Sequence, residues 1–191
     1  MDHYKDAFKV LPVLAHNRSL LPGAARGDGC VTSGDEQSPR IRYVAGVPSD
    51  SFSHTARAHA PIARVWAALD LPATWENIGV VDRVFDPRFE DGHLASFSFE
   101  TVAAGKRYFG EANPAERLEG SVMGWRIENA EVRGTVEVSL TSVDDDTTEI
   151  TVNLDVEGVG LLSTMFFPVV AVAIGSGLPR AVDQFAAGFS D

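Results

Sequence analysis

The segment at residues 158–189, GVGLLSTMFFPVVAVAIGSGLPRAVDQFAAGF, decides the fold. Its apolar run at 161–174 is interrupted only by Ser163 and Thr164. A run of 14 residues is too short to cross a bilayer, for which roughly 20 are needed. It is also too uniformly apolar for an ordinary surface helix. We therefore predict a buried C-terminal helix, with irregularities at its prolines and glycines.

The rest of the domain must supply the surface that covers this helix. Short segments with period-two alternation predict about seven antiparallel strands with one buried and one solvated face. The expected strands are residues 52–60, 80–85, 94–102, 106–112, 121–132, 135–143 and 148–157. Two short helices, at 61–70 and 73–78, are expected after the first strand, since Pro61 suits the first turn of a helix.

The first 50 residues differ from the rest. The stretch at 23–40 is rich in glycine and has almost no large apolar side chain, so it cannot offset the entropy of ordering. We expect residues 1–50 to be an N-terminal extension that is flexible or partly helical. Residues 51–191 are expected to form the folded domain.

Composition excludes several classes of partner. The net charge of −11, from 27 acidic and 16 basic residues, disfavours nucleic acid and anionic membrane surfaces. No segment predicts stable membrane insertion. The one cysteine, Cys30, rules out an intrachain disulfide, and the N-terminus lacks the apolar run of a secretory signal. A cytoplasmic protein is the expectation.

The order of elements, together with four motifs, is similar to a known superfamily. HAPIARVWAALDLPATW at 59–75 resembles the opening of the START/polyketide cyclase (SRPBCC) superfamily. Gly134-Thr135-Val136, Thr147-Thr148-Glu149-Ile150 and the segment at 156–162 resemble its closing half, most closely in the branch related to the G-type subunit of carbon monoxide dehydrogenase. The resemblance covers residues 52–189. It implies an α+β helix-grip fold, in which a curved sheet wraps the C-terminal helix around an apolar cavity.

Apolar residues at inward positions are candidates for the wall of that cavity. They are Phe97, Phe99, Met123, Trp125, Met165 and Phe166. The alternative is plain core packing, which is the interpretation for Trp66 and Trp75. Ligand sites are mostly apolar with a few placed polar groups, and methionine and aromatic side chains adapt to varied shapes.

Polar groups of inward parity would orient a ligand. If Phe109 points inward, so do Arg107 and Glu111 on the same strand face; in the alternative register Tyr108 is inside and both charges are in water. His54 shares a face with Phe52 and is either a hydrogen-bonded core residue or a base.

No catalytic set, metal site or cofactor motif can be assembled from the sequence. The histidines lack ligand spacing, and the acidic turn at 144–146 lacks the glycine and distal glutamate of a calcium loop. Gly158 and Gly160 have no third glycine at the spacing that dinucleotide binding requires. We expect no metal and no cofactor.

Three functions agree with these observations. The first is a binding module or carrier for a small hydrophobic molecule of lipid, polyketide or isoprenoid type. The second is a cyclase or dehydratase that uses an acid/base pair in the same cavity. The third is an accessory or assembly factor that acts through protein contacts, and a homodimer is compatible with all three.

Overall fold

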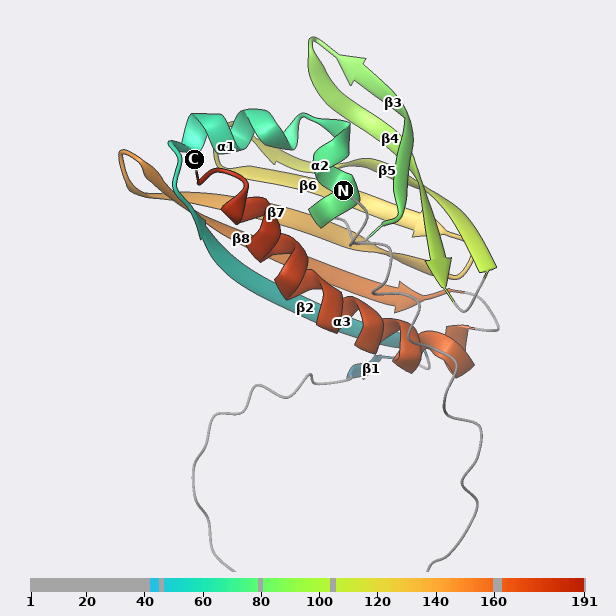
Figure 1. The fold of residues 1–191 in the computed structure, drawn as a ribbon. Coiled ribbons are helices and arrows are strands. Elements are labelled where there is room, and N and C mark those ends of the chain that lie inside the picture. The colour runs from blue at the N-terminus through green and yellow to red at the C-terminus, as the bar shows by residue number, and fades with distance from the viewer. Residues whose placement is uncertain (1–41, 45–46, 79–80, 104–105, 160–162, 191) are drawn as a thin grey trace, which may run out of the picture. The chain divides into compact units, whose positions relative to one another are not determined.

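The computed structural model describes residues 42–44, 47–78, 81–103, 106–159 and 163–190. In these residues eight strands form one antiparallel sheet in the order β1-β2-β8-β7-β6-β5-β4-β3 (Figure 1). The strands are β1 (Arg42–Val44), β2 (Val47–Ala58), β3 (Arg83–Glu90), β4 (His93–Ala103), β5 (Lys106–Leu118), β6 (Val122–Asn129), β7 (Val132–Asp144) and β8 (Thr147–Gly158). The seven expected strands and the α+β fold class are confirmed, and the three-residue β1 is an addition.

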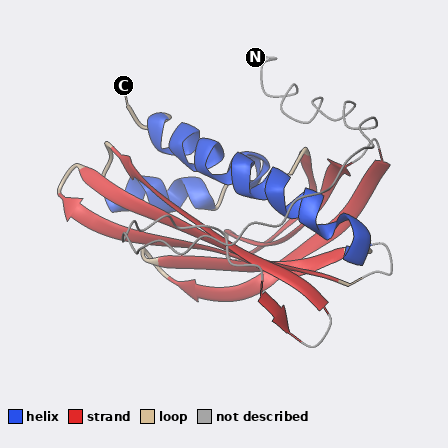
Figure 2. Ribbon diagram, turned by 90° about the horizontal axis from the view of Figure 1, so that it is seen from below, coloured by secondary structure: helices blue, strands red, loops and turns tan. Residues whose placement is uncertain are grey.

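Three helices lie on one face of the sheet (Figure 2), which we call the inner face. They are α1 (Ile62–Leu69), α2 (Pro72–Ile78) and α3 (Ser163–Ala187). The opposite face of the sheet is the outer face. None of the described helices is both long enough and apolar enough to cross a membrane.

Strand alternation places the core between the helices and the inner face. Along β7, Val136, Val138 and Leu140 are buried as expected, and Ile150 and Val152 are buried on the neighbouring β8. Their sequence neighbours point to the outer face. The alternation visible in the sequence thus determines which side of the sheet the helices cover.

Helices α1 and α2 are joined by side chains that bond to the end of α1. The indole nitrogen of Trp75 donates to the Leu69 carbonyl at 2.8 Å, and the Thr74 hydroxyl donates to the Ala68 carbonyl at 2.6 Å. These bonds satisfy carbonyls that the helix end leaves without partners. Trp75 is fully buried and Trp66 is nearly so, which confirms that both are core residues.

The C-terminal helix α3 is one helix of 25 residues that contains Pro168 and Pro179. It approaches the sheet closely at Gly175, where a β-carbon would lie 2.7 Å from Cε1 of Phe52 on β2. A larger residue at position 175 would push the helix away from β2. The predicted C-terminal helix is confirmed and continues through both prolines, but it is not buried on all sides, because Val169 and Val172 are 50% and 73% exposed.

The sheet begins before the domain boundary that we expected at residue 51. Arg42 on β1 pairs with Ser49 on β2, and Ser49 pairs with Glu157 on β8. All described elements belong to one compact unit, Pro39–Asp191. The predicted structure of residues 1–41 lies outside the described residues.

Asn113 and Pro114, which lie between the strands expected at 106–112 and 121–132, continue β5 instead. They pair with Arg126 and Trp125 on β6, and the register shifts only between Pro114 and Arg117. Proline is tolerated in a sheet where a bulge interrupts the ladder. The strand therefore continues through the bulge to Leu118.

Candidate functional site

An aromatic cluster forms the closed part of the inner face. The Trp125 ring lies 5.5 Å from Trp75 and 5.2 Å from Phe97, both in edge-on geometry. Trp75 of α2 also stacks on Phe97 at 6.2 Å. The four strand residues predicted to line a cavity, Phe97, Phe99, Met123 and Trp125, are all buried on this face. Helix α2 covers the cluster, so these side chains contribute to the core there, and a ligand role for them stays a prediction.

Other inner apolar side chains are only partly buried. We call Phe52, Val84, Ile127, Val132 and Ile174 the inner apolar surface. They come from β2, β3, β6, β7 and α3 and pack against the buried core. Apolar groups that keep part of their surface in water gain free energy when a further apolar molecule covers them, at about 25 cal/mol per Å². This surface is where an apolar ligand would gain most on the inner face.

The structure selects one of the two registers that the sequence left open for β5. Phe109 is 59% exposed and lies edge-on to Phe85 at 6.3 Å on the outer face. Arg107 lies on the same face and pairs with Glu100 at 3.3 Å. Glu111 is exposed as well, and Tyr108 takes the inward parity. The structure therefore has the register with Tyr108 inside, and the candidates Arg107, Phe109 and Glu111 do not face the predicted inner cavity.

Gly110 is the physical reason for this register. A β-carbon at Gly110 would lie 2.4 Å from Cζ of Phe99, so the Phe99 ring lies directly over this position. The next inward residue, Ala112, is fully buried. Only small side chains fit beneath that ring, which places the even-numbered residues of β5 inside.

His54 is inward and hydrogen-bonded, as one of the two interpretations expected. Its Nε2 lies 2.8 Å from Oδ1 of Asp183 on α3. The His54 side chain is 28% exposed and that of Asp183 is 62% exposed. The pair joins β2 to α3 and holds an imidazole with a carboxylate partner at the edge of the inner face.

The two predicted residues on α3 cannot be placed in the same way. Met165 and Phe166 belong to the first turns of α3, but their side chains lie outside the described residues. The next residue, Phe167, is buried against the core. The role of Met165 and Phe166 stays a prediction.

A cluster of charged groups that we did not predict lies where α1 ends. Arg117 on β5 donates to both carboxylate oxygens of Asp70, at 2.9 and 3.1 Å. Nδ1 of His93 lies 2.9 Å from Asp70 Oδ2 and 3.0 Å from the Arg117 guanidinium. The Arg117 guanidinium also stacks over Trp66, 5.1 Å from the ring centre. The cluster fastens α1 to β4 and β5.

The environment of Asp70 shifts its titration. Burial raises the pKa of the Asp70 carboxyl, while hydrogen bonds from Arg117, His93 and the Leu94 amide lower it. The lowering effects together are larger, so the pKa of Asp70 lies below its ordinary value. Asp70 therefore stays a carboxylate at neutral pH and stabilises the cluster in that form.

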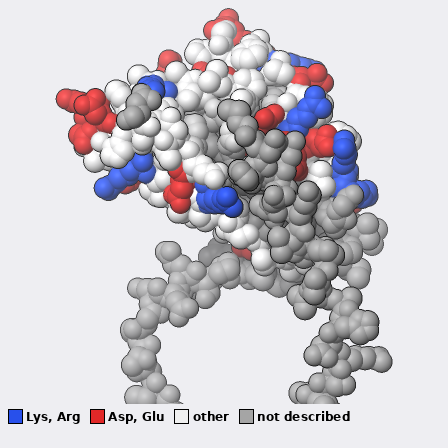
Figure 3. Space-filling model, in the orientation of Figure 1, with Lys and Arg blue, Asp and Glu red and all other residues white. Residues whose placement is uncertain are grey.

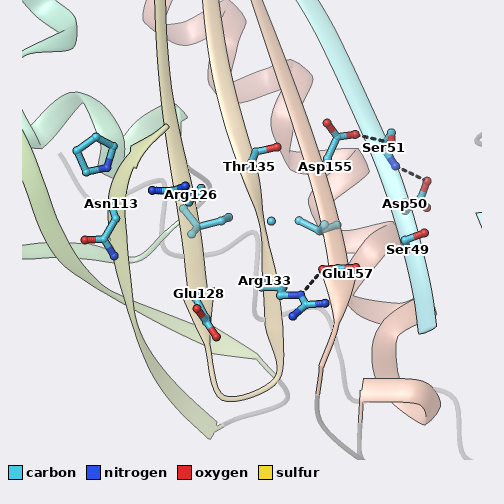
Figure 4. Close-up of a pocket in the computed structure, with 14 residues that line it drawn as sticks. Ser49, Asp50, Ser51, Asn113, Arg126, Glu128, Arg133, Thr135, Asp155 and Glu157 are labelled. Atoms are coloured by element: carbon cyan, nitrogen blue, oxygen red, sulfur yellow. Dashed lines mark hydrogen bonds and ion pairs between the residues drawn. The ribbon is translucent and has the colours of Figure 1, made fainter. Parts of the chain in front are cut away.

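The described hollows lie on the outer face of the sheet. One, of about 780 Å³, is lined mainly by polar residues of five strands (Figure 4), with Pro114, Ile127 and Val156 also in its lining. Within it Arg133 pairs with Glu157, and the Ser51 hydroxyl donates to Asp155 at 2.5 Å. A second hollow of about 360 Å³ lies beside it and shares Arg126 and Thr135. The charged side chains that line both hollows suit water or a polar partner better than an apolar molecule.

Charge is spread over the surface. On the face turned to the viewer in Figure 3, Lys and Arg side chains lie among Asp and Glu side chains. No group of three or more metal-binding side chains comes together within the part of the chain that the structure describes.

Comparisons with known proteins identify the fold. No family model and no curated protein matches the chain. Among solved structures, the chain is similar to the Zhui aromatase/cyclase from Streptomyces, with a TM-score of 0.56 and 15% identity over 72% of this chain and 93% of that one. It is also similar to the protein CV1439 from Chromobacterium violaceum, with a TM-score of 0.53 and 15% identity over 74% of this chain and 99% of that one. The protein TTHA0849 from Thermus thermophilus gives a TM-score of 0.51 and 16% identity over the same shares.

These similarities agree with the resemblance seen in the sequence. The chain has the fold of the Zhui aromatase/cyclase, in which a curved antiparallel sheet holds a long C-terminal helix. At this level of identity the similarity extends to the fold and no further. The closer relation to the branch of the G-type subunit of carbon monoxide dehydrogenase stays a prediction.

Proposed function

We propose that the protein binds a small hydrophobic molecule of lipid, polyketide or isoprenoid type between the inner face of the sheet and α3, and acts as its carrier. The observation that carries the proposal is the inner apolar surface. Phe52, Ile127 and Ile174 are partly buried side chains from a strand near the sheet edge, a central strand and the helix. A ligand that covers them removes apolar surface from water without having to displace a polar partner.

The outer hollows do not suit such a ligand. Arg126, Glu128 and Asp155 all line the larger one. An apolar molecule placed there would take charged groups out of water without replacing their hydrogen bonds, which is unfavourable. The helix-covered face is therefore the better candidate, even though the described hollows are on the other side.

One observation supports a second function, a cyclase or dehydratase that acts on the same ligand. General acid–base catalysis needs a titratable group that is held in place near the reacting atom. His54 is such a group, because its Nε2 lies 2.8 Å from Oδ1 of Asp183. Glu111, the other base considered from the sequence, is exposed on the outer face and is not a candidate.

Two substitutions on one strand test the site. Ile127 is partly buried on the inner face, and its neighbour Glu128 is exposed on the outer face. With 1-anilinonaphthalene-8-sulfonate as the probe, Ile127→Arg should abolish the fluorescence increase while Glu128→Arg leaves it unchanged. Circular dichroism should show that both variants are folded, because a long cation can extend towards the opening of a site. Equal probe binding by the two variants would contradict the inner site.

A turnover assay separates the two functions. If the protein converts an aromatic polyketide analogue, His54→Gln should reduce the rate by about 10²-fold or more, which is the size of a general acid–base contribution. Binding of the analogue should be retained. A rate unchanged by His54→Gln would show that His54 is not the base and would point to a contaminating or uncatalysed reaction, whereas no conversion at all would leave the carrier function as the proposal.

The remaining expectations complete this proposal. A reducing cytoplasmic setting rests on the single cysteine, Cys30. We expect the protein to act without a cofactor and without nucleic acid, as a monomer or homodimer. These expectations rest on the sequence motifs and the net charge of −11.

A further inference from the structure

The indole nitrogens of the three tryptophans differ in their hydrogen bonding. Trp75 donates to the Leu69 carbonyl at 2.8 Å. Among the described residues, Trp66 Nε1 and Trp125 Nε1 are buried and have no hydrogen-bond partner. A buried donor without an acceptor costs roughly 1–3 kcal/mol, so buried indole N–H groups usually have a partner.

The surroundings of Trp125 explain why the group lacks an acceptor. Its side chain is 2% exposed, so water does not reach it. The rings of Trp75 and Phe97 lie edge-on to it at 5.5 and 5.2 Å. An aromatic face is only a weak acceptor for an N–H group. Its neighbours in the register, Pro114 and Val136, offer apolar side chains.

Trp125 also lies beside the surface that we assign to the ligand. Ile127, of the inner apolar surface, is the next inward residue of the same strand β6. Successive inward residues on a strand are about 7 Å apart, because each residue adds roughly 3.3 Å. A ligand that covers Ile127 therefore lies beside Trp125, and its oxygen atom reaches the buried indole nitrogen when the aromatic cluster around that nitrogen opens.

We propose that Trp125 Nε1 is the hydrogen-bond donor that selects the ligand. This inference rests on the proposed function and narrows the class of ligand to an apolar body that carries an uncharged acceptor oxygen, such as a ketone, ester or quinone carbonyl. The acceptor would pair with the indole donor that the described part of the chain leaves unsatisfied beside the inner apolar surface. A pure hydrocarbon of the same shape would leave the donor without a partner and would bind more weakly.

Trp66 is the natural control for this proposal. Its N–H group is also without a partner among the described residues, but it lies under the Arg117 guanidinium, 5.1 Å from the ring centre. That end of the domain carries the cluster of Asp70 and His93 and not the inner apolar surface. A ligand bound at the inner apolar surface should leave the Trp66 signal unchanged.

The experiment uses two probes that differ by one acceptor. Fluorene and 9-fluorenone are tricyclic molecules of nearly the same shape, and only fluorenone has a carbonyl oxygen. The full chain is labelled with ¹⁵N-tryptophan, and the three indole signals are assigned with Trp→Phe variants. Fluorenone should move the Trp125 indole proton downfield and leave the Trp66 and Trp75 signals in place, whereas fluorene should produce no downfield shift. Fluorenone should also bind about three- to tenfold more tightly than fluorene, which is the effect of one hydrogen bond.

A variant makes the test quantitative. Trp125→Phe keeps an aromatic ring and removes the donor, so the preference for fluorenone should disappear in it and persist in Trp66→Phe. If Trp125→Phe does not fold, the comparison of the two probes in the natural chain still decides. Equal affinity for both probes, or a shift at Trp66 instead of Trp125, would overturn the inference and leave the proposed function standing. If neither probe binds, the proposed function fails, and the inference fails with it.

Discussion

Gly110→Ala is the substitution that most sharply tests which side chains face the site. The added methyl group would lie 2.4 Å from Cζ of Phe99 and 2.6 Å from the backbone oxygen of Glu128, so the ring or strand β6 must move. Overpacking of this kind costs about 1–3 kcal/mol, and alanine in place of glycine in a strand returns about 0.5–1 kcal/mol. We expect a net loss of about 1–2 kcal/mol.

Thermal unfolding measures this loss. For a chain of this length, 1 kcal/mol corresponds to about 2–4 °C, so Tm should fall by about 2–8 °C. Glu111→Ala, at the next position and on the outer face, should change stability by less than about 0.5 kcal/mol. In a Phe99→Leu background the loss at Gly110 should shrink, with a coupling above about 0.5 kcal/mol.

One result would refute the register of β5. If Gly110→Ala is as stable as Glu111→Ala, the Phe99 ring does not lie over Gly110. The odd-numbered residues Arg107 and Phe109 would then face the ligand, as the rejected register had them.

Three further predictions concern the charged cluster, the start of the domain and α3. Asp70→Asn should lower the free energy of unfolding by about 1–3 kcal/mol at neutral pH. Because the pKa of Asp70 is lowered in the folded chain, this loss should be constant above the pKa of Asp70 in the unfolded chain and should vanish as pH falls through its pKa in the folded chain. Urea unfolding across pH 2–7 would show this dependence, and a loss that does not change with pH would contradict it. A chain that begins at Pro39 should keep the cooperative thermal transition of the full chain, whereas one that begins at Asp50 lacks β1 and should melt at a lower temperature; equal melting would show that β1 adds no stability. Met165→Arg should abolish binding of an apolar dye in a folded protein, as judged by fluorescence and circular dichroism, and unfolding would show that Met165 is a core residue.

The sequence predicts the fold because its local patterns agree with the tertiary structure. Val136, Val138 and Leu140 alternate with polar residues. Because a helix must cover one face of the sheet, only one register turns these apolar side chains toward the helix. The uniformly apolar run at 161–174 identifies the C-terminal helix as the element that the apolar face of the sheet must cover. The sequence also assigns Trp75 to the core, and its bond to Leu69 agrees.

The site is less predictable, because its residues meet through tertiary contacts. In residues 106–112, either register would turn one aromatic side chain inward, Tyr108 in one and Phe109 in the other. The contact of Phe99 with Gly110 decides between the two registers. The cluster of Asp70, His93 and Arg117 joins a helix end to two strands, and no spacing in the sequence signals it.

Native mass spectrometry of freshly purified protein tests the central claim most directly. We expect the natural chain to carry an additional mass of lipid-like size that is released on gentle activation. Glu128→Arg should retain this mass, and Ile127→Arg should lose it while keeping the charge-state distribution of a folded protein. A natural chain that carries no such mass and takes up neither fluorenone nor the anilinonaphthalene dye would contradict the proposal that the inner face binds a hydrophobic ligand.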